Sequence, residues 1–421
     1  MSPLSVSMLR PPVGWFDVVI FDEASQVLPA DAMTSIKAAR QVVVAGDDKQ
    51  LPPTTFFATG EDGEEEIIDD IDDESVKVGH YESILSLMKY IITKPRQLRW
   101  HYRSRDERLI AFSNEKLYRS LITFPDSAED SCLTFVKVNS GPSTVSVRAS
   151  NLAEVQEVVG LIREHASVRP EESLGVIALG TPHANAIEDS LWAAAHEDSD
   201  LASFLESHRE EPFFVKNLER VQGDERDAII LTIGYGRNSK GEILYNFGPI
   251  NGRFGERRLN VAVTRAKNRM TLVSTFSHVE LDEKKCKSGG LPFLRDYIRY
   301  VESGGVEFGD TSAVRVEMNA FEHSIYSRLT SAGFQVLPQY GVGKYRIDFA
   351  VVNPNDPSKF ALAIECDGAS YHSQPTARER DRLRQDALER RGWRFHRIWS
   401  TDWFVDPDGE LDRCVAAIVD N

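Results

Sequence analysis

The sequence predicts an α/β protein built on parallel sheets, and three features support this fold class. A continuous apolar run, Val18–Phe21, ends in two adjacent carboxylates. A second apolar run, Val42–Ala45, ends at Gly46. Between residues 134 and 250, predicted helices over Asn151–Ile162 and Asn185–Ala195 alternate with predicted strands, one of them over Leu174–Ala178, which is typical of a parallel sheet. Continuous apolar runs of this length favour strands that are buried on both faces.

The composition is that of a folded protein with two or three domains, since 41% of the 421 residues are hydrophobic and 27% are charged. No stretch approaches the roughly 18 apolar residues of a membrane span. The four cysteines lack the paired spacing of a zinc site or a disulfide framework. We therefore expect a cytoplasmic protein with no membrane partner.

The formal net charge of −16 is concentrated in one stretch, because residues 61–74 hold ten acidic residues and no basic one. The rest of the chain then carries −16 + 10 = −6. The total charge does not exclude a nucleic-acid partner, because local basic surfaces decide such binding. We expect a solvated loop at 61–74, and a loop that mimics a nucleic-acid strand is the alternative.

Asp22 and Glu23 lie at the carboxyl end of a predicted strand, where ligands of parallel sheets bind. Asp22 would hold Mg²⁺ through water, and Glu23 would orient an attacking water. The stretch FDVVIFDEASQ resembles the Walker B element of superfamily-1 helicases of the Upf-like and Dna-replication-type branch. That resemblance implies RecA-like lobes with an ATP site.

Two further stretches follow in the order of this helicase family. GDDKQLPPT resembles motif III, which implies that Gln50 senses a terminal phosphate. LRWHYRS resembles motif IV, which implies that Arg103 reaches the γ-phosphate and that Tyr102 stacks near the adenine. Arginine suits this role because it stays charged and its fork matches phosphate oxygens. A solvated helix start is the alternative interpretation of this arginine cluster.

Two stretches of the second predicted α/β domain complete the helicase pattern. VQGDERD resembles motif V, which implies that Gly223 permits close backbone approach and that Glu225 holds the ribose. ERRLNVAVTRAK resembles motif VI, which implies that Arg265 is a second arginine finger. For Arg257 and Arg258, structural ion pairs are at least as reasonable an interpretation as a functional role.

No GxxxxGK[ST] stretch occurs among the 421 residues, so no phosphate loop or lysine holds the β- and γ-phosphates. We expect Met1 to lie inside a longer ancestral protein. ATP would then be a cofactor only if missing N-terminal sequence, or an N-terminal helicase half as a separate chain, supplies that loop. This chain alone is predicted not to hydrolyse ATP.

The C-terminal region shows a different order of elements. The sequence predicts a helix over Ala320–Ala332, strands over Tyr345–Val352 and Phe360–Asp367, and a turn over Asn353–Ser358 between the two strands. These elements are expected to form a separate α/β domain.

The two predicted strands carry three carboxylates, Asp348, Glu365 and Asp367. Glu365 and Asp367 are two residues apart and therefore share one face of their strand. Hard carboxylate oxygens favour Mg²⁺ or Mn²⁺, which can activate water against a phosphodiester. Glu322 on the preceding helix would orient the metal's water.

This pattern resembles the PD-(D/E)xK nuclease core, in the subgroup similar to very-short-patch-repair endonucleases. The resemblance implies that His372 is the general base and that Asp381 orients it. The usual third-position lysine is Asp367 here, so the lysine role is absent or moved. Residues 378–397 hold eight arginines against four acids, which is where a phosphate backbone could lie. A degenerate nuclease fold kept for DNA binding or packing is the alternative.

The sequence thus predicts four segments: a partial first RecA-like lobe (1–95), a second lobe (96–277), a linker (278–312) that contains a short helix over Leu291–Val301, and a nuclease-like domain (313–421). The expected function is the C-terminal part of an ATP-dependent DNA helicase-nuclease, acting on single-stranded or duplex DNA as in phage defence. An RNA or ribonucleoprotein helicase fragment is one alternative. A catalytically inactive nucleic-acid-binding or interaction module that completes another chain is the other.

Overall fold

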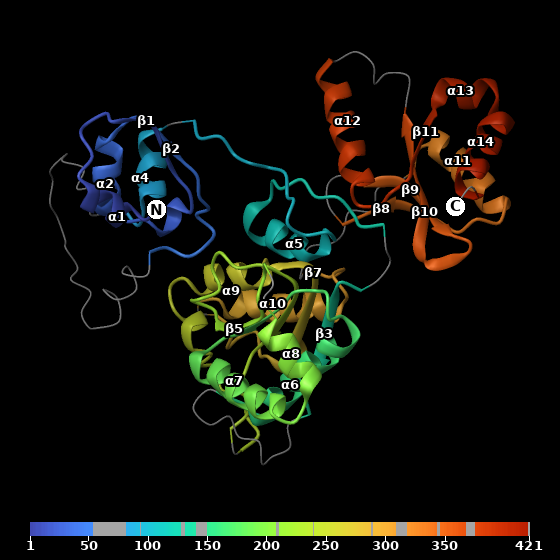
Figure 1. Cartoon of the computed structure of the whole chain (residues 1–421). Helices are drawn as coiled ribbons and strands as arrows, with labels where there is room; N and C mark the ends of the chain where they lie inside the picture. The colour runs from blue at the N-terminus through green and yellow to red at the C-terminus, as the bar shows by residue number, and fades with distance from the viewer. Residues whose placement is uncertain are drawn as a thin grey trace.

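The computed structural model divides the described chain into three parts, each built on its own sheet (Figure 1). In the described part, no helix is both long and apolar enough to cross a bilayer. The side chains at 358 and 375–381 are left undescribed, although their backbone is placed. The described residues are 1–53, 81–92, 94–127, 131–139, 150–207, 210–238, 240–287, 289–308, 318–342, 346–367 and 375–419.

The first part contains one parallel pair of strands. Its elements are α1 (Pro3–Leu9), β1 (Phe16–Phe21), η1 (Ala24–Gln26), α2 (Pro29–Lys37), β2 (Ala39–Val44) and α4 (Ile84–Ile91). Both predicted strands form, in parallel, with Val19 opposite Val42. Helix α4 begins with a capping box at Ser83 and buries Ile84, Leu85 and Leu87. The predicted acidic loop at 61–74 lies outside the described residues.

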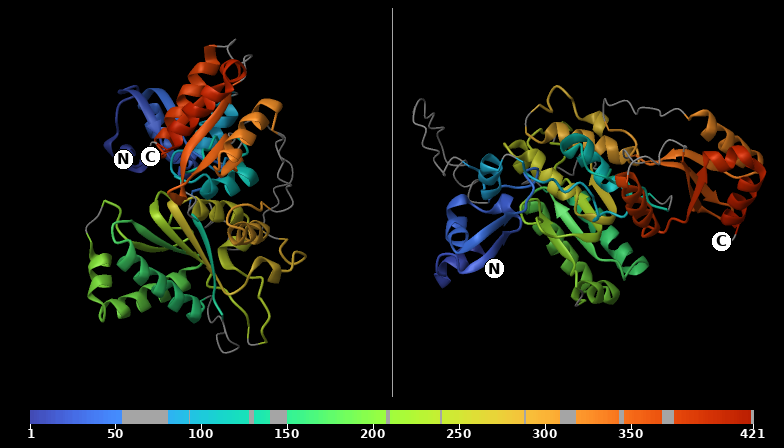
Figure 2. Two further views of the ribbon diagram at one scale, coloured as in Figure 1. Left: turned by 90° about the vertical axis from the view of Figure 1, so that its right-hand side faces the viewer. Right: turned by 90° about the horizontal axis from the view of Figure 1, so that it is seen from above.

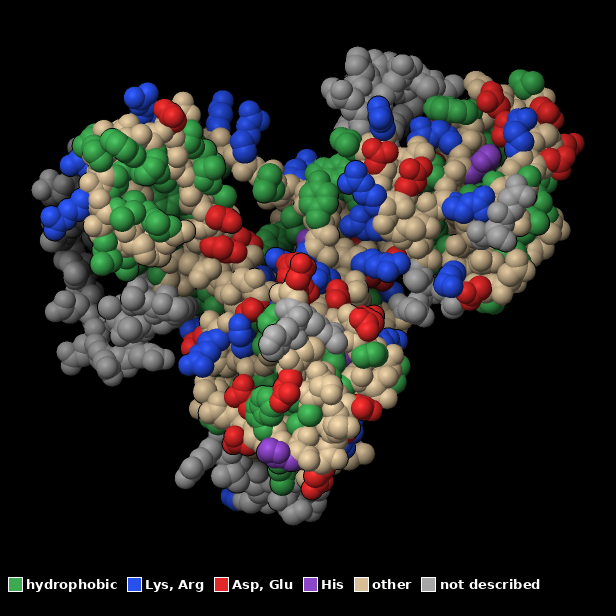
Figure 3. All heavy atoms as spheres, in the orientation of Figure 1, with side chains coloured by type: hydrophobic (Ala, Val, Ile, Leu, Met, Phe, Trp, Pro, Cys, Tyr) green, Lys and Arg blue, Asp and Glu red, His purple; other side chains and the backbone are tan. Residues whose placement is uncertain are grey.

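The expectation that these two strands are buried on both faces is wrong. Phe21 packs with α2 and α4, but Ile20 is 69% exposed and Val43 is 49% exposed. Side chains alternate across a strand, so the face opposite the helices carries Val18 and Ile20 into solvent. Among the described residues, neither strand has a further neighbour in its sheet. Figure 3 shows hydrophobic side chains gathered on this part of the surface.

The second part is a five-stranded parallel sheet in the order β3-β7-β6-β4-β5. Its elements are α5 (Arg108–Ser113), η3 (Asn114–Tyr118), β3 (Leu133–Lys137), α6 (Leu152–Val168), β4 (Leu174–Ala178), α7 (Thr181–Ala195), α8 (Ser199–Glu206), β5 (Phe214–Asn217), β6 (Arg226–Thr232), η4 (Gly248–Asn251), α9 (Gly255–Val263), β7 (Ala266–Ser274), η5 (His278–Glu280) and α10 (Leu291–Glu302). The predicted strand–helix alternation is confirmed, and β4 has the predicted bounds. Every residue of β4 is buried, as a central strand covered on both faces requires.

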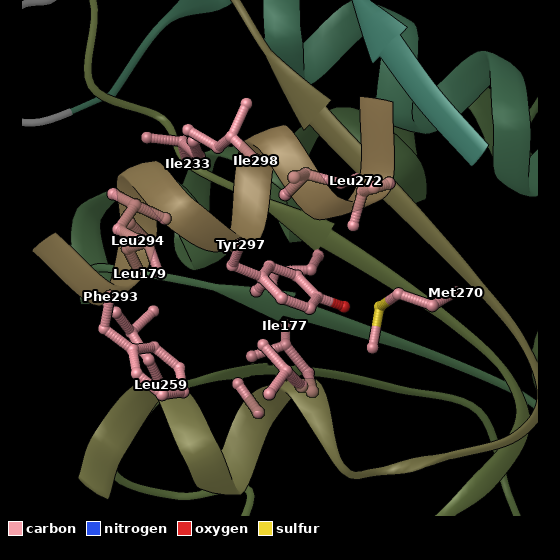
Figure 4. Close-up of a cluster of buried hydrophobic side chains, with 14 of the residues drawn as sticks. Ile177, Leu179, Ile233, Leu259, Met270, Leu272, Phe293, Leu294, Tyr297 and Ile298 are labelled. Carbon is pink, nitrogen blue, oxygen red and sulfur yellow. The ribbon is translucent and has the colours of Figure 1, made fainter. Parts of the chain in front are cut away.

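Helix α10 forms where the sequence predicted a short helix in a linker. Its apolar face is buried in the core of the second part, where Leu294, Tyr297 and Ile298 pack with Ile177 and Leu259 (Figure 4). The helix is therefore an integral element of this part of the molecule.

The third part is a four-stranded mixed sheet in the order β11-β10-β9-β8, with β10 parallel to β11 and antiparallel to β9. Its elements are α11 (Ala320–Ser331), β8 (Val336–Tyr340), β9 (Ile347–Asn353), β10 (Asp356–Asp367), α12 (Pro375–Glu389), β11 (Phe395–Trp399), α13 (Ser400–Val405) and α14 (Pro407–Val419). The turn between β9 and β10 is tighter than predicted, since Asp356 already pairs with Asn353. A register shift after Asp356 accommodates Pro357 near the start of the strand.

Candidate functional site

Asp22 and Glu23 follow β1 directly, at the junction of the first and second parts. Glu23 has a φ of 49°, in the left-handed region that is costly for residues other than glycine. Its N–H donates to Asp22 Oδ1 at 2.9 Å. Gln222 of the second part donates through Nε2 to Glu23 Oε2 at 3.4 Å. Both carboxylates are exposed and therefore accessible to a ligand at this junction.

Arg265 is the buried arginine of the junction, with 1% of its surface exposed. Its Nε donates to the carbonyl of Val261 at 2.8 Å, and its Nη2 lies 3.4 Å from Gln50 Oε1. Burial lowers the pKa of Arg265 to about 10, and the nearby Arg103 also lowers it. Arg265 is therefore still a cation at neutral pH, positioned by α9 beside the loop that carries Gln50.

Arg103 lies at the same junction. Its Nε donates to Glu225 Oε2 at 2.7 Å, and its Nη1 donates to the carbonyl of Thr264 at 3.2 Å. Glu23, Arg103 and Glu225 all act electrostatically on Arg265. The structure thus brings together five of the residues expected from the helicase resemblance, which are Glu23, Gln50, Arg103, Glu225 and Arg265.

Three residues that the sequence analysis did not select tie the same junction together. Tyr118 donates through its hydroxyl to Asp47 Oδ2 at 2.6 Å. Asn260 donates through Nδ2 to the carbonyl of Lys49 and to the Tyr118 hydroxyl, both at 2.9 Å. Asp47 and Asn260 lie inside stretches already singled out for their resemblance. Tyr118 carries no sequence signal, because its contacts join residues 71 and 142 positions apart.

Two predicted nucleotide-binding residues lie apart from these contacts. Tyr102 is 74% exposed, and its ring stacks on Trp100 with centroids 6.4 Å apart. Gly223 has a φ of 87° and open space where a Cβ would lie, so its backbone conformation rather than crowding requires glycine.

The three predicted carboxylates of the third part lie on adjacent strands, as expected. Asp348 on β9 accepts the Cys366 N–H at 2.8 Å, and Gln339 Nε2 lies 3.4 Å from Asp348 Oδ1. Glu365 on β10 is buried and forms an ion pair with Arg384 of α12 at 2.7 Å. Each of these two carboxylates is therefore held by a donor of the protein itself.

Asp367 forms an ion pair with Arg397 of β11 at 3.0 Å. Burial raises the pKa of Glu365 to about 8; Arg384 opposes this shift, and Asp348 and Asp367 reinforce it. Burial also raises the pKa of Asp348, with a further increase from Glu322. Mutual repulsion among carboxylates is the condition that a divalent cation relieves.

The remaining predicted nuclease residues are placed differently. Glu322 closes a capping box at the start of α11, where its carboxylate accepts the Asn319 N–H at 3.0 Å. His372 lies outside the described residues, and Asp381 lies on α12 without a described side chain. Among the described residues, no group of three or more His, Cys, Asp or Glu is arranged to hold a metal ion. A cation at Asp348 and Glu365 would have to displace Arg384 from Glu365.

Three families match successive stretches of the chain. Residues 6–57 match one AAA domain family, residues 81–277 match another, and residues 321–418 match the REase_MTES_1575 family. The chain therefore carries AAA domains like those of ATP-dependent helicases, followed by a restriction-endonuclease-like domain.

Several curated relatives share 25–30% identity with this chain. The chain is 30% identical to the uncharacterized ATP-dependent helicase MG140 of Mycoplasma genitalium over 422 residues, covering 95% of this chain and 36% of that protein. It is 26% identical to the DNA-binding protein SMUBP-2 of Rattus norvegicus, covering 62% and 25%. It is 25% identical to the DNA replication ATP-dependent helicase/nuclease DNA2 of Gallus gallus, covering 61% and 23%. The chain spans about a third or less of the length of these relatives.

Among solved structures, the C-terminal domain of a possible DNA helicase from Lactobacillus plantarum matches with 20% identity and a TM-score of 0.25, over 41% of this chain and 86% of that one. The HK97 bacteriophage large terminase matches with 12% identity and a TM-score of 0.27, over 75% and 78%. Likenesses this low carry no argument about the fold.

Proposed function

We propose that this chain is the C-terminal portion of an ATP-dependent DNA helicase-nuclease, and that its third part cleaves DNA with Mg²⁺ or Mn²⁺. The observation that carries the proposal is the pair Asp348 and Glu365, on adjacent strands β9 and β10, whose carboxylates repel one another in a largely buried setting. Buried carboxylates at such a site are costly unless they bind cations.

Asp348, Glu365 and Asp367 are the residues that would hold the metal, and their oxygens suit a hard divalent cation. When bound, the ion would activate water and stabilise charge on the phosphodiester. Arg384 and Arg397 keep two of these carboxylates in place in the absence of a cation. His372 and Asp381 remain the proposed general base and its orienting carboxylate.

DNA is the proposed substrate. The names of two relatives refer to DNA, and residues 378–397 hold eight arginines, of which Arg384 and Arg397 form ion pairs with Glu365 and Asp367. An RNA substrate is the alternative, because the helicase resemblance covers RNA translocases as well. A binding competition distinguishes the two substrates. Labelled single-stranded DNA is bound to the chain, and unlabelled DNA or RNA of the same sequence is added; a DNA enzyme would release the label only when DNA is added.

We further propose that the first and second parts form an incomplete ATP site. Asp22, Glu23, Gln50, Arg103 and Arg265 supply the metal, water and γ-phosphate contacts, with Tyr102, Gly223 and Glu225 on the base and ribose side. The phosphate loop is absent from these 421 residues. The curated relatives are single chains of greater length, so they offer no support for a separate N-terminal chain. DNA-stimulated ATP hydrolysis by residues 1–421 that Glu23→Gln abolishes would overturn this part of the proposal.

The nuclease proposal is tested by nicking of supercoiled plasmid with Mg²⁺ or Mn²⁺. Asp348→Ala and Glu365→Ala should each reduce the rate at least about 100-fold, because each removes a metal ligand. Asp408→Ala is the matched control, since Asp408 is an exposed acid paired with Arg328 in the same domain. A wild-type chain that cuts no DNA with either metal would favour the inactive binding module instead.

A further inference from the structure

Residues 99–127, here called the connecting segment, run from the arginine at the candidate nucleotide site to the nuclease-like domain. The segment contains α5, which lies beside the C-terminal domain in Figure 1 and in the right-hand view of Figure 2. It falls within the AAA domain match at 81–277, whereas the nuclease-like match begins only at residue 321. The two family matches thus assign it to the helicase alone.

The side chains of this segment nevertheless complete the core of the nuclease-like sheet. Phe124 is 3% exposed and belongs to one buried cluster with Phe360 of β10 and Trp393. Trp100 packs against the same cluster, and its ring lies 5.4 Å from that of Phe124. A hydrophobic core therefore crosses the boundary between the two family matches.

Hydrogen bonds to backbone carbonyls fix the same contact. Trp393 donates through Nε1 to the carbonyl of Pro125 at 3.0 Å. Ser127 donates through its hydroxyl to the carbonyl of Arg391 at 2.8 Å, and its own carbonyl accepts the Phe360 N–H at 3.1 Å. These bonds join the segment to the loop before β11 and to β10.

A buried carboxylate provides a second attachment. Glu107 is 3% exposed and accepts the Val342 N–H of the nuclease-like domain at 2.6 Å. Its other oxygen accepts the Thr123 hydroxyl at 2.7 Å, which ties the two ends of the connecting segment together. A buried carboxylate without such donors would strongly destabilise the fold. The bonds from Val342 and Thr123 are therefore needed to keep Glu107 buried at this contact.

At its other end the segment is bonded to the helicase sheet. Arg105 donates its N–H to the carbonyl of Lys267 at 2.8 Å, beside the start of β7. His101 donates its N–H to Ile122 at 3.0 Å, and Ile122 donates to Arg99, so the stretch around Arg103 is paired with the stretch that leads to Phe124.

We propose that the connecting segment couples the stretch around Arg103 to the nuclease-like sheet through a shared core centred on Phe124. Because the same segment carries Arg103, any displacement of that arginine would move the surface on which β10 rests. This proposal requires neither a bound metal nor nuclease activity, so it stands or fails separately from the proposed function.

Hydrogen–deuterium exchange of the full chain tests the proposal. Phe124→Ala should speed the exchange of amides in β9 and β10, and of residues 99–105, at least tenfold, because it empties the shared core. Exchange in β4 and β6 should not change. The matched control is Phe204→Ala, which empties a buried site in a separate core of the helicase lobe and should leave β9 and β10 protected.

If Phe124→Ala does not fold, Ser127→Ala removes a single hydrogen bond at the same contact and should still speed exchange in β10 several-fold. The proposal is overturned if either folded variant opens only the connecting segment while β9 and β10 stay as protected as in the wild type.

Discussion

At the scale of single residues, the second part contains a buried acidic side chain, Glu154, which lies in none of the helicase-like stretches. Glu154 is fully buried and accepts the N–H groups of Gly234 at 2.7 Å and Thr275 at 3.1 Å. Thr232 donates its hydroxyl to Glu154 at 2.9 Å and therefore accepts from His183 Nε2, also at 2.9 Å. This chain of bonds pins α6 and α7 to the ends of β6 and β7.

Glu154 and His183 change the pH dependence of folding stability in opposite directions. Burial lowers the pKa of His183 to about 4 and raises the pKa of Glu154 to about 7. Between pH 7 and pH 5 the unfolded chain protonates His183 but the folded chain does not, which lowers stability by about 2 kcal/mol. Over the same range the folded chain protonates Glu154 and the unfolded chain largely does not, which raises stability by a similar amount.

In the variant His183→Gln, the pH dependence of stability should therefore reflect Glu154 without the opposing effect of His183. On acidification from pH 7 to pH 5, the free energy of unfolding of the variant should rise by about 2 kcal/mol relative to that of the wild type. Urea unfolding at the two pH values measures this difference. A variant that keeps the wild-type pH dependence would show that His183 is not held neutral in the folded chain.

At the scale of elements, the strands and helices of the second part could be predicted because apolar runs and helical spacing are local properties. The bounds of β4 and the presence of α6, α7 and α10 followed from the sequence in this way. The role of α10 could not be predicted in this way, because the charged and glycine-containing stretches on either side of it are typical of a linker. Its burial depends on contacts with residues more than 100 positions away, such as Ile177.

Leu294→Ala tests the integral role of α10. The substitution should lower the free energy of unfolding by about 2–5 kcal/mol, because Leu294 is completely buried and its removal leaves a cavity. Val279→Ala, at a position that is 74% exposed, should change it by less than about 0.5 kcal/mol. Equal effects of the two substitutions in urea unfolding would place α10 outside the core.

At the scale of the whole molecule, the candidate helicase residues of both parts could be proposed from the sequence because their motifs keep a fixed order. The sequence could not show which of them meet, since Arg103 and Glu225 are 122 positions apart. It also predicted burial for β1 and β2 from their composition alone. An apolar run indicates a strand that can be buried, but burial itself requires a covering element, and one face of this pair has none among the described residues.

Ile20→Lys tests the exposed face of β1. The wild-type chain should bind the dye ANS and self-associate, because exposed apolar strand edges promote both. The variant should lose most of the dye fluorescence. Val168→Lys, which replaces a valine that is 64% exposed on the second part, is the control. Dye binding that is equal in both variants would show that the β1 face is covered in solution.

The central claim is that Asp348 and Glu365 belong to a divalent metal site, and calorimetric titration of the full chain with Mn²⁺ tests it most directly. We predict binding that Asp348→Asn weakens at least tenfold and that the control Asp408→Asn leaves unchanged. Binding that is absent in the wild type, or that is the same in Asp348→Asn, would contradict the claim.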